Sequence, residues 1–398
     1  MTSKATRAAP ATRRRRDRKE QLAALAADLF RRHGYHAVGI SDIASAAGIT
    51  GPAVYRHFSS KQEILAHVLR SGVDALVSAV TTHLDGPGTP EQRLAALTEA
   101  LAQLAVERRD AVALWRWLGR HLDPEPQAEV RARAEYLMGR WIDQLRAVRP
   151  DLPPADADLL CRAAMGVLGS TANYSVSLSK PRQARLLGRL ALAVQYAELP
   201  SAPEPTPASP VTASGGLANS RREVLLTEAT RLFRERGYHA VTMEDIGAAA
   251  GIAGPSVYRH FSSKAELIWA AATRMVERLT LGVSWATHGV TDPRKALDRL
   301  IDSYAETVLA HRDLMAVYVA EVASLPEQER AALRRLQRGY VAEWIRLVGA
   351  ANPDLTPAEA RVVAHAALTL ATDLARTGRL NSRPGLAAEI AALMRVVA

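Results

Sequence analysis

The sequence GYHAVGISDIASAAGITGPAVYRHFSSK at residues 34–61 occurs again as GYHAVTMEDIGAAAGIAGPSVYRHFSSK at residues 237–264. The two stretches align without a gap and are identical at 21 of 28 positions. The same offset of 203 residues persists downstream, where PDL at 150–152 corresponds to PDL at 353–355. A repeat that keeps one offset over such a length indicates two copies of a whole domain rather than of a short motif.

A proline-rich segment at residues 199–219 separates the two copies. It contains five prolines and two glycines, which exclude a continuous helix. A spacer of this kind extends by ~3.1 Å per residue, so its reach is roughly 60 Å. The first half of the chain therefore ends near residue 198, and the second half begins near residue 220.

The composition favours helices throughout. Hydrophobic residues make up 48% of the 398 residues but aromatic residues only 5%, a balance typical of helical proteins rich in Ala and Leu. Leu22, Ala26, Leu29 and Phe30 recur with helical spacing, and residues 225, 229, 232 and 233 repeat that pattern. Further amphipathic stretches at 60–84, 90–122, 125–148, 155–179 and 181–198 have counterparts in the second half. We expect an all-α fold.

Charge and cysteine content restrict the class of protein. The net charge is +10, and residues 1–20 hold eight basic against two acidic residues, 8 − 2 = +6. A basic N-terminal arm suits a polyanion such as DNA, although a solvated tail has the same composition. The single cysteine, Cys161, excludes an intrachain disulfide and a zinc-cysteine cluster. No secretory signal and no apolar run of ~20 residues is apparent, so we expect a cytoplasmic protein.

Each repeated stretch has the pattern of a helix-turn-helix. Residues 41–47 and 244–250 are predicted to form a supporting helix, and Gly48 and Gly251 begin the turn. A second helix then starts at Gly51-Pro52 and Gly254-Pro255, where proline costs no backbone hydrogen bond. In this motif the second helix enters the major groove and its first residues face base edges.

The residues expected to contact DNA lie on or beside this second helix. Small residues allow close approach, the tyrosines, arginines and histidines supply donors, and the lysines suit phosphate. Val54, Phe58, Val257 and Phe261 are expected in the core, and the two histidines have packing as an alternative role. The predicted DNA-binding residues are Arg14, Arg15, Arg16, Ser41, Thr50, Gly51, Pro52, Ala53, Tyr55, Arg56, His57, Lys61, Thr242, Gly254, Pro255, Ser256, Tyr258, Arg259, His260 and Lys264.

The pattern across these 28 residues resembles the DNA-binding signature of the TetR family, and the doubled arrangement is similar to tandem actinobacterial repressors of the mce-operon type. The resemblance covers residues 18–66 and 221–269. It implies a repressor whose later helices bind a small effector and thereby weaken DNA binding. The implied organisation is a basic flexible arm at 1–16, helix-turn-helix domains at 17–66 and 220–269, effector and dimerisation domains at 67–198 and 270–398, and a linker at 199–219.

The two copies differ at their helix starts. Thr242 can cap the supporting helix of the second copy, where the first copy has Gly39, whereas Thr50 can cap the first recognition helix and Ala253 cannot cap the second. We therefore expect two related DNA half-sites, recognised with unequal strength.

An enzyme is the main alternative class. Ser177 and Lys180 match a serine-x-x-lysine pair, but the companion elements of that chemistry are missing, and no metal or cofactor motif stands out. The predictions are no catalytic residue, no metal and no cofactor. A ligand-independent activator or architectural DNA-binding protein remains a second alternative.

Aromatic and methionine residues in the later helices could line an apolar pocket, although core packing explains such residues equally well. A lipid- or sterol-like effector would suit it. Glu321 is either a pocket determinant or a solvated edge. The candidate pocket residues are Trp115, His121, Tyr136, Trp141, Met315, Tyr318, Glu321, Tyr340 and Trp344.

Both terminal helix pairs, at 155–198 and 357–398, occur in one chain. Ordinary members of the family pair such helices between two chains. The linker exceeds the ~34–36 Å between successive major grooves on one DNA face, so the sequence favours a single-chain pseudo-dimer. A homodimer that pairs like halves is the rival.

Overall fold

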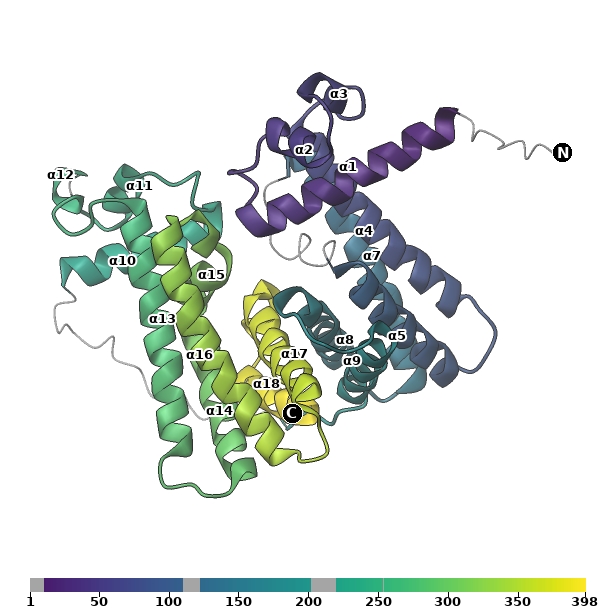
Figure 1. Cartoon of the computed structure of the whole chain (residues 1–398). Coiled ribbons are helices and arrows are strands. Elements are labelled where there is room, and N and C mark those ends of the chain that lie inside the picture. Colours follow the sequence, from purple (N-terminus) through teal and green to yellow (C-terminus); the bar gives the residue numbers. More distant parts are fainter. Residues whose placement is uncertain (1–10, 110–121, 202–219, 253) are drawn as a thin grey trace. The chain divides into compact units, whose positions relative to one another are not determined.

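The structure, a computed structural model, describes residues 11–109, 122–201, 220–252 and 254–398. Throughout these ranges the regular secondary structure is helical, with no strand (Figure 1). The helices divide into two compact units, Met1–Gln144 and Leu145–Ala398. The all-α prediction is confirmed, although the packing divides the chain before the terminal helices of the first half rather than at the linker.

The first unit is built from a helix-turn-helix domain followed by longer helices. Its α1 begins at Ala11, so the helix starts inside the segment predicted as a flexible arm at 1–16, and residues 11–16 extend it. Its helices are α1 (Ala11–His33), α2 (Ile40–Ala46), α3 (Gly51–Tyr55), α4 (Lys61–Leu84), α5 (Pro90–Glu107) and α7 (Pro124–Val148), the last of which crosses into the second unit.

One hydrophobic core holds the first three helices on the beginning of α4. Phe30 and Phe58 are each 1% exposed in this cluster, and Ile43 and Val54 are fully buried. By length and composition α4 could cross a membrane, a feature that the sequence prediction did not recognise. Its apolar residues include Ile64, which belongs to the same core, so α4 acts as a core helix that leads from the motif into the next bundle.

Charged and polar side chains connect α7 to α4 and to the start of α5 in the first unit. Arg70 Nε donates to Glu129 at 2.7 Å, and Arg133 pairs with Asp74. Gln144 Nε2 donates to the carbonyl of Pro90 at 2.8 Å. Exposed ion pairs of this kind contribute little individually, but they fix the direction of α7 along the other two helices.

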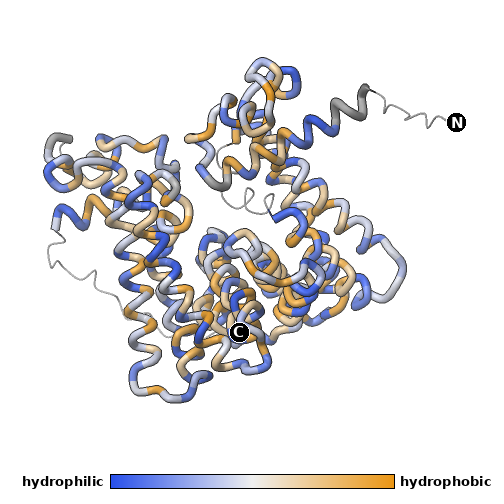
Figure 2. Tube along the Cα trace, in the orientation of Figure 1, coloured by the Kyte–Doolittle hydropathy of each residue, from blue (hydrophilic) through white to orange (hydrophobic). Residues whose placement is uncertain are grey.

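The second unit begins with the terminal helices of the first half and includes the whole second half. As Figure 2 shows, its helices carry both hydrophobic and hydrophilic residues, as expected for amphipathic helices in a bundle. The helices are α8 (Pro154–Gly169), η2 (Ser170–Asn173), α9 (Lys180–Gln195), α10 (Arg221–Arg236), α11 (Met243–Ala249), α12 (Gly254–Val257), α13 (Lys264–Thr287), α14 (Pro293–Ala310), α15 (Arg312–Ala320), η3 (Val322–Ser324), α16 (Glu327–Ala351), α17 (Pro357–Arg376), η4 (Gly378–Leu380) and α18 (Leu386–Val397).

Within this unit, α8 and α9 of the first half pack against α17 and α18 of the second (Figure 1). Small residues bring α8 and α17 close together: a Cβ placed on Gly166 would lie 2.9 Å from the Cα of Leu370. Polar contacts frame this apolar seam, including Asn173 Nδ2 to Thr369 Oγ1 at 2.9 Å. The two terminal helix pairs thus form one continuous interface inside a single chain.

Candidate nucleic-acid interface

The first recognition helix is short and held from below. Gly48 takes a φ of 63°, which only glycine adopts without strain, and so turns the chain from α2 into α3. Val54 is fully buried and Phe58 is 1% exposed. Tyr55 is 56% exposed, and Arg56 is also exposed. The core residues therefore anchor α3 while its tyrosine and the following arginine face outward.

The second motif repeats this arrangement. Gly251 takes a φ of 65°, and Val257 and Phe261 are fully buried. Tyr258 is 50% exposed and Arg259 is exposed beside it. The exposure of Gly254 and the side chain of Pro255 lie outside what the structure describes. Both copies thus present one tyrosine and one arginine from an anchored helix.

The remaining predicted DNA contacts fall into three groups. Ser41, Thr50 and Pro52 are exposed, whereas Gly51, Ala53 and Ser256 are half-buried. His57 and His260 are also half-buried, a position compatible with either packing or donation. The side chains of Arg14, Arg15 and Arg16 lie outside the described residues.

The two copies differ in helix capping as predicted at Gly39 and Thr242, but the capping predicted at Thr50 is not present. Thr242 Oγ1 accepts from the N–H of Asp245 at 3.0 Å, and Asp245 Oδ2 accepts from the N–H of Thr242 at 2.9 Å. Gly39 has only the second half of this capping box, its N–H donating to Asp42 Oδ2 at 2.7 Å. Thr50 stands at the N-cap of α3 but makes no side-chain capping hydrogen bond, so the cap predicted there is wrong.

Lys61 and Lys264 fold back into their own domains. Lys61 Nζ donates to the carbonyls of Tyr35 and Val38 at 2.9 and 3.0 Å. Lys264 Nζ repeats this with Tyr238 and Val241, at 2.7 Å each. Burial lowers the pKa of both lysines. Two of three donors on each ammonium are therefore occupied, and the phosphate contact predicted from sequence has only the third.

Cationic residues on the first helix of each motif cover the ring that anchors the recognition helix. Lys19 Nζ lies 4.7 Å from the ring centroid of Phe58, and the guanidinium of Arg222 lies 4.1 Å from that of Phe261. The two cations occupy equivalent positions, 203 residues apart. The sequence analysis missed this pair, although the conserved basic character at that offset would have identified it.

An acidic residue distinguishes the exposed side of the second motif. Glu244 is exposed on α11, and the hydroxyl of Tyr258 lies 3.4 Å from its Oε1. The first motif has Ser41 at the equivalent position. A carboxylate beside the recognition tyrosine lowers the local positive potential, so the two copies offer DNA different electrostatic surfaces.

The candidate pocket residues of the first half do not form a group in the structure. Trp115 and His121 lie outside the described residues. Tyr136 is 51% exposed and its hydroxyl accepts from Arg140, so it lines no interior pocket and its assignment was wrong. Trp141 is fully buried. Leu101 and Leu137, both buried, occupy the positions that correspond to Tyr304 and Tyr340 of the second half.

The second half brings candidate residues together around the ring of Tyr304. The ring of Tyr304 lies 5.4 Å from that of Trp344 and 6.4 Å from that of Tyr340, centroid to centroid. Its hydroxyl lies 3.1 Å from Thr372 Oγ1. Met315 and Tyr318 are buried as well. The cluster is therefore aromatic and carries several hydroxyl groups.

Polar atoms in this cluster are incompletely satisfied. Burial raises the pKa of Tyr304 to about 12 and that of Tyr340 well above its ordinary value. The indole of Trp344 lowers the pKa of Tyr340, against the effect of burial. Neither the indole N–H nor the Tyr340 hydroxyl, however, forms a hydrogen bond of good geometry. The Trp344 indole therefore interacts with the Tyr340 hydroxyl without a geometrically good hydrogen bond between them.

Glu321 is buried, 3% exposed, and so is not a solvated edge. Burial raises the pKa of Tyr238, and the negative charge of Glu321 raises it further. Burial lowers the pKa of Lys264, and the charge of Glu321 opposes that effect. Tyr238 and Lys264 belong to the second helix-turn-helix domain. The charge of Glu321 therefore adds to the effect of burial on Tyr238 and opposes it on Lys264.

Groups of His, Cys, Asp and Glu suited to a metal ion do not occur among the described residues.

Two models of known protein families match parts of the chain. The model of bacterial regulatory proteins of the tetR family matches residues 22–68 and 225–271, and that of the tetracyclin repressor-like C-terminal domain matches residues 290–376. Both helix-turn-helix stretches are thus matched separately.

Similar proteins are regulators of single-copy length. The transcriptional activator FasR of Mycolicibacterium smegmatis is 30% identical over 166 residues, 42% of this chain and 75% of that protein. The repressor KstR2 of the same organism is 32% identical over 152 residues, 36% of this chain and 73% of that protein. A solved structure of the ketosteroid regulator KstR2 of Mycobacterium tuberculosis is 25% identical, covering 46% of this chain and 97% of that one, with a TM-score of 0.39.

The relatives are regulators and not enzymes, which removes the serine-x-x-lysine alternative. Each relative corresponds to less than half of this chain, while the helix-turn-helix model matches it twice. The chain belongs to the TetR family of transcriptional regulators, with two family domains in tandem.

Proposed function

We propose that this chain is a ligand-responsive repressor that binds one operator with both of its helix-turn-helix motifs. The operator would contain two related half-sites in imperfect inverted repeat, and the two halves of one chain would act as a pseudo-dimer. The protein would work in the cytoplasm, where its DNA is.

The observation that carries the DNA-binding part is the duplicated exposure of the recognition helices. Tyr55 and Tyr258 are half exposed or more, while the valines and phenylalanines beside them are buried. In a helix-turn-helix, the exposed side chains of the anchored second helix are the ones that face base edges in the major groove. Adjacent arginines supply the positive charge that phosphate requires. Each motif therefore suits one half-site.

The pairing of α8 and α9 with α17 and α18 supports the single-chain arrangement. These helices bury a seam of small apolar residues, and Arg182 Nε donates to Glu359 Oε1 across it at 3.1 Å. A tether raises the effective concentration of one partner to the millimolar range. Intramolecular pairing is then favoured over the assembly of two chains.

The effector would bind in the second half. The buried hydroxyls of Tyr304 and Tyr340 have leucines, Leu101 and Leu137, at the equivalent positions of the first half. An apolar pocket with a few polar groups suits a lipid- or sterol-like molecule that carries a hydroxyl or carbonyl. Movement of α15 would reach the DNA-binding domain through its packing against α10, where Arg234 pairs with Asp313.

Operator selection from a random duplex library tests the DNA-binding proposal. The recovered duplex should contain two half-sites and bind one chain, and Arg56→Gln and Arg259→Gln should each weaken binding at physiological salt. Arg335→Gln, an equal charge change at an exposed position of α16, is the matched control. Equal affinity of all three variants would overturn the assignment of the motifs.

Release of the operator by a panel of fatty acids, acyl thioesters and sterols tests the effector proposal. We expect Tyr340→Phe to weaken the response of the full chain and Tyr136→Phe, at an exposed position of the first half, to leave it unchanged. Activation is the second candidate function, because FasR is named an activator. A reporter gene whose expression rises with the regulator would favour it.

A further inference from the structure

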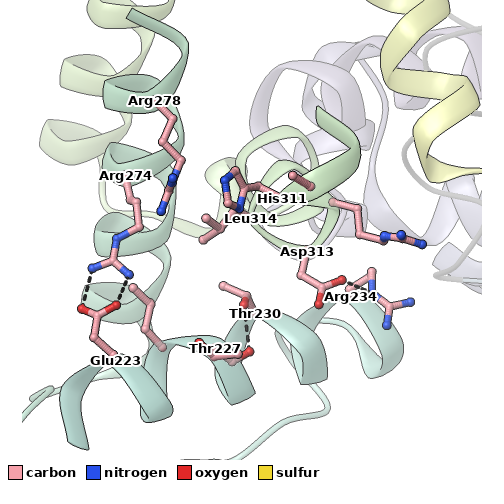
Figure 3. Close-up of a pocket in the computed structure, with 12 residues that line it drawn as sticks. Glu223, Thr227, Thr230, Arg234, Arg274, Arg278, His311, Asp313 and Leu314 are labelled. Carbon is pink, nitrogen blue, oxygen red and sulfur yellow. Dashed lines mark hydrogen bonds and ion pairs between the residues drawn. The ribbon is translucent and has the colours of Figure 1, made fainter. Parts of the chain in front are cut away.

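The second half contains a hollow beside its first helix, α10. None of the residues that line this hollow belongs to the aromatic cluster. It has a volume of about 390 Å³ and is enclosed by α10, the middle of α13 and the junction of α14 with α15 (Figure 3). On α10 its lining residues Glu223, Thr227, Thr230 and Arg234 share one face of the helix. The hollow thus joins the DNA-binding domain to the effector helices.

Two of the four arginines that line the hollow form ion pairs with carboxylates of the lining. Arg274 donates to both carboxylate oxygens of Glu223, at 2.6 and 2.8 Å. Arg234 Nε donates to Asp313 Oδ1 at 2.5 Å. Figure 3 shows these pairs on opposite sides of the hollow. Both carboxylates in the lining are therefore already neutralised.

Arg278 and Arg312 supply the remaining positive charge of the lining, and the charge of Arg278 adds to the effect of Arg274 in lowering the pKa of Glu223. Neither forms an ion pair within the part of the chain that the structure describes, and both line the hollow. Arg278 extends from α13 toward the space between the pairs, beside His311 (Figure 3). Burial first, and then the charge on Arg278, lowers the pKa of His311, which is the effect of a positive local potential on a neighbouring base.

We propose that this hollow binds a small organic anion with at least two negative charges, of the phosphate-ester or pyrophosphate type. Four lining arginines against two carboxylates leave a charge of 4 − 2 = +2, which a dianion would balance. Guanidinium groups bind phosphate oxygens with charge-assisted hydrogen bonds. The Thr227 hydroxyl adds a neutral donor, whereas the Thr230 hydroxyl already donates to the carbonyl of Thr227 at 2.9 Å. Such a ligand would connect α10 with α13 and α15, and so hold the DNA-binding domain on the effector helices.

The first half provides an internal comparison. Its equivalents of Arg274 and Arg278 are Ser71 and Ala75, and Glu20 there lies 3.0 Å from His67 Nε2 instead of pairing with an arginine. The threonines at 227 and 230 correspond to alanines at 24 and 27. The arginines of α13 and the threonines of α10 thus have no counterpart in the first half, although its sequence keeps Arg109 at the position of Arg312.

Calorimetric titration of the full chain with pyrophosphate at constant ionic strength tests the proposal. We expect saturable binding of one pyrophosphate per chain at this hollow. Arg278→Ala, which installs the residue of the first half, and Arg312→Gln should each weaken it about tenfold, the expected loss of one charge-assisted hydrogen bond. Circular dichroism of each variant should match that of the wild type, because both side chains lie at the rim of the hollow rather than in the core.

Two controls separate this site from the DNA-binding surfaces, which also attract anions. Arg335→Gln makes the same charge change outside the hollow, and the double variant Arg56→Gln, Arg259→Gln removes charge from both recognition motifs. Both should retain the wild-type affinity for pyrophosphate. No saturable binding, or binding that the recognition-motif variant abolishes while Arg278→Ala and Arg312→Gln leave it intact, would overturn the anion site without affecting the proposed operator binding.

Discussion

The two helix-turn-helix domains of this chain have the same interior and different exteriors. Each buries a valine and a phenylalanine under its recognition helix and clamps two backbone carbonyls with one lysine. On the exposed side, Ser41 in one copy corresponds to Glu244 in the other. Residues that fix the helices are thus the same in both copies, and so are the exposed tyrosine and arginine of the recognition helix, whereas the neighbouring position of the supporting helix has changed from serine to glutamate.

The effector regions differ more strongly than the DNA-binding domains. Trp141 and Trp344 are both fully buried, but the two tyrosines beside Trp344 correspond to leucines in the first half. Arginines on α13 have no counterpart on α4. The second half therefore combines both candidate ligand sites, and the first half supplies a DNA-binding domain and one side of the α8–α17 seam.

The largest effect should come from separating the two halves. Gly166→Leu places a side chain where even a Cβ would meet the backbone of Leu370, and overpacking of this kind costs about 3 kcal/mol of unfolding free energy. Urea denaturation measures that loss, and operator affinity should fall with it. Gly139→Ala, at a helical glycine with open space around it, is the control. Wild-type stability and DNA binding in Gly166→Leu would show that the seam is not required.

Removal of the lysine clamps should affect both copies equally. Lys61→Ala and Lys264→Ala each leave two carbonyls without a donor, at a cost of about 2 kcal/mol. The loss should appear in denaturation curves and exceed any direct effect on DNA. Lys295→Ala, at the exposed start of α14, serves as control. A large loss of operator affinity with unchanged stability would instead support phosphate contact as the main role.

The recognition tyrosines should reveal the asymmetry between half-sites. Tyr55→Ala and Tyr258→Ala should each reduce operator affinity about tenfold, the scale of one lost groove contact, with helical content unchanged because both side chains are exposed. Glu244→Ser should strengthen binding by the second copy, since it removes a carboxylate near phosphate. Fluorescence anisotropy on duplexes carrying one half-site would measure this. Weaker binding by Glu244→Ser would mean that the carboxylate contacts a base.

Helix capping gives the smallest expected difference. Thr242→Ala removes the capping box of α11 at a cost of about 1 kcal/mol. Gly39→Thr should stabilise the first copy by a few tenths of a kcal/mol, since residue 39 has an N-cap conformation that threonine adopts and Asp42 is already in place. Thermal unfolding of the two variants measures both changes in stability. Opposite signs would show that the capping difference does not explain the stability of either copy.

The repeat and its helical periodicity were sufficient to predict the fold, because both are properties of spacing along the chain. The roles of Lys61 and Glu321 were not predictable in the same way. The lysine ammonium meets carbonyls 23 and 26 residues earlier, and Glu321 acts on Tyr238, more than 80 residues away. Such contacts depend on how helices pack, which periodicity does not specify. Tyr136 shows the converse, since an aromatic residue within an amphipathic helix can still face water.

Sedimentation of the full chain, free and bound to its selected operator, tests the central claim most directly. A pseudo-dimer predicts a free mass of 43.0 kDa at micromolar concentration, and a complex that contains one chain per two-half-site duplex. A stable species of twice that mass, with two chains on each duplex, would contradict the account and show that like halves pair between chains.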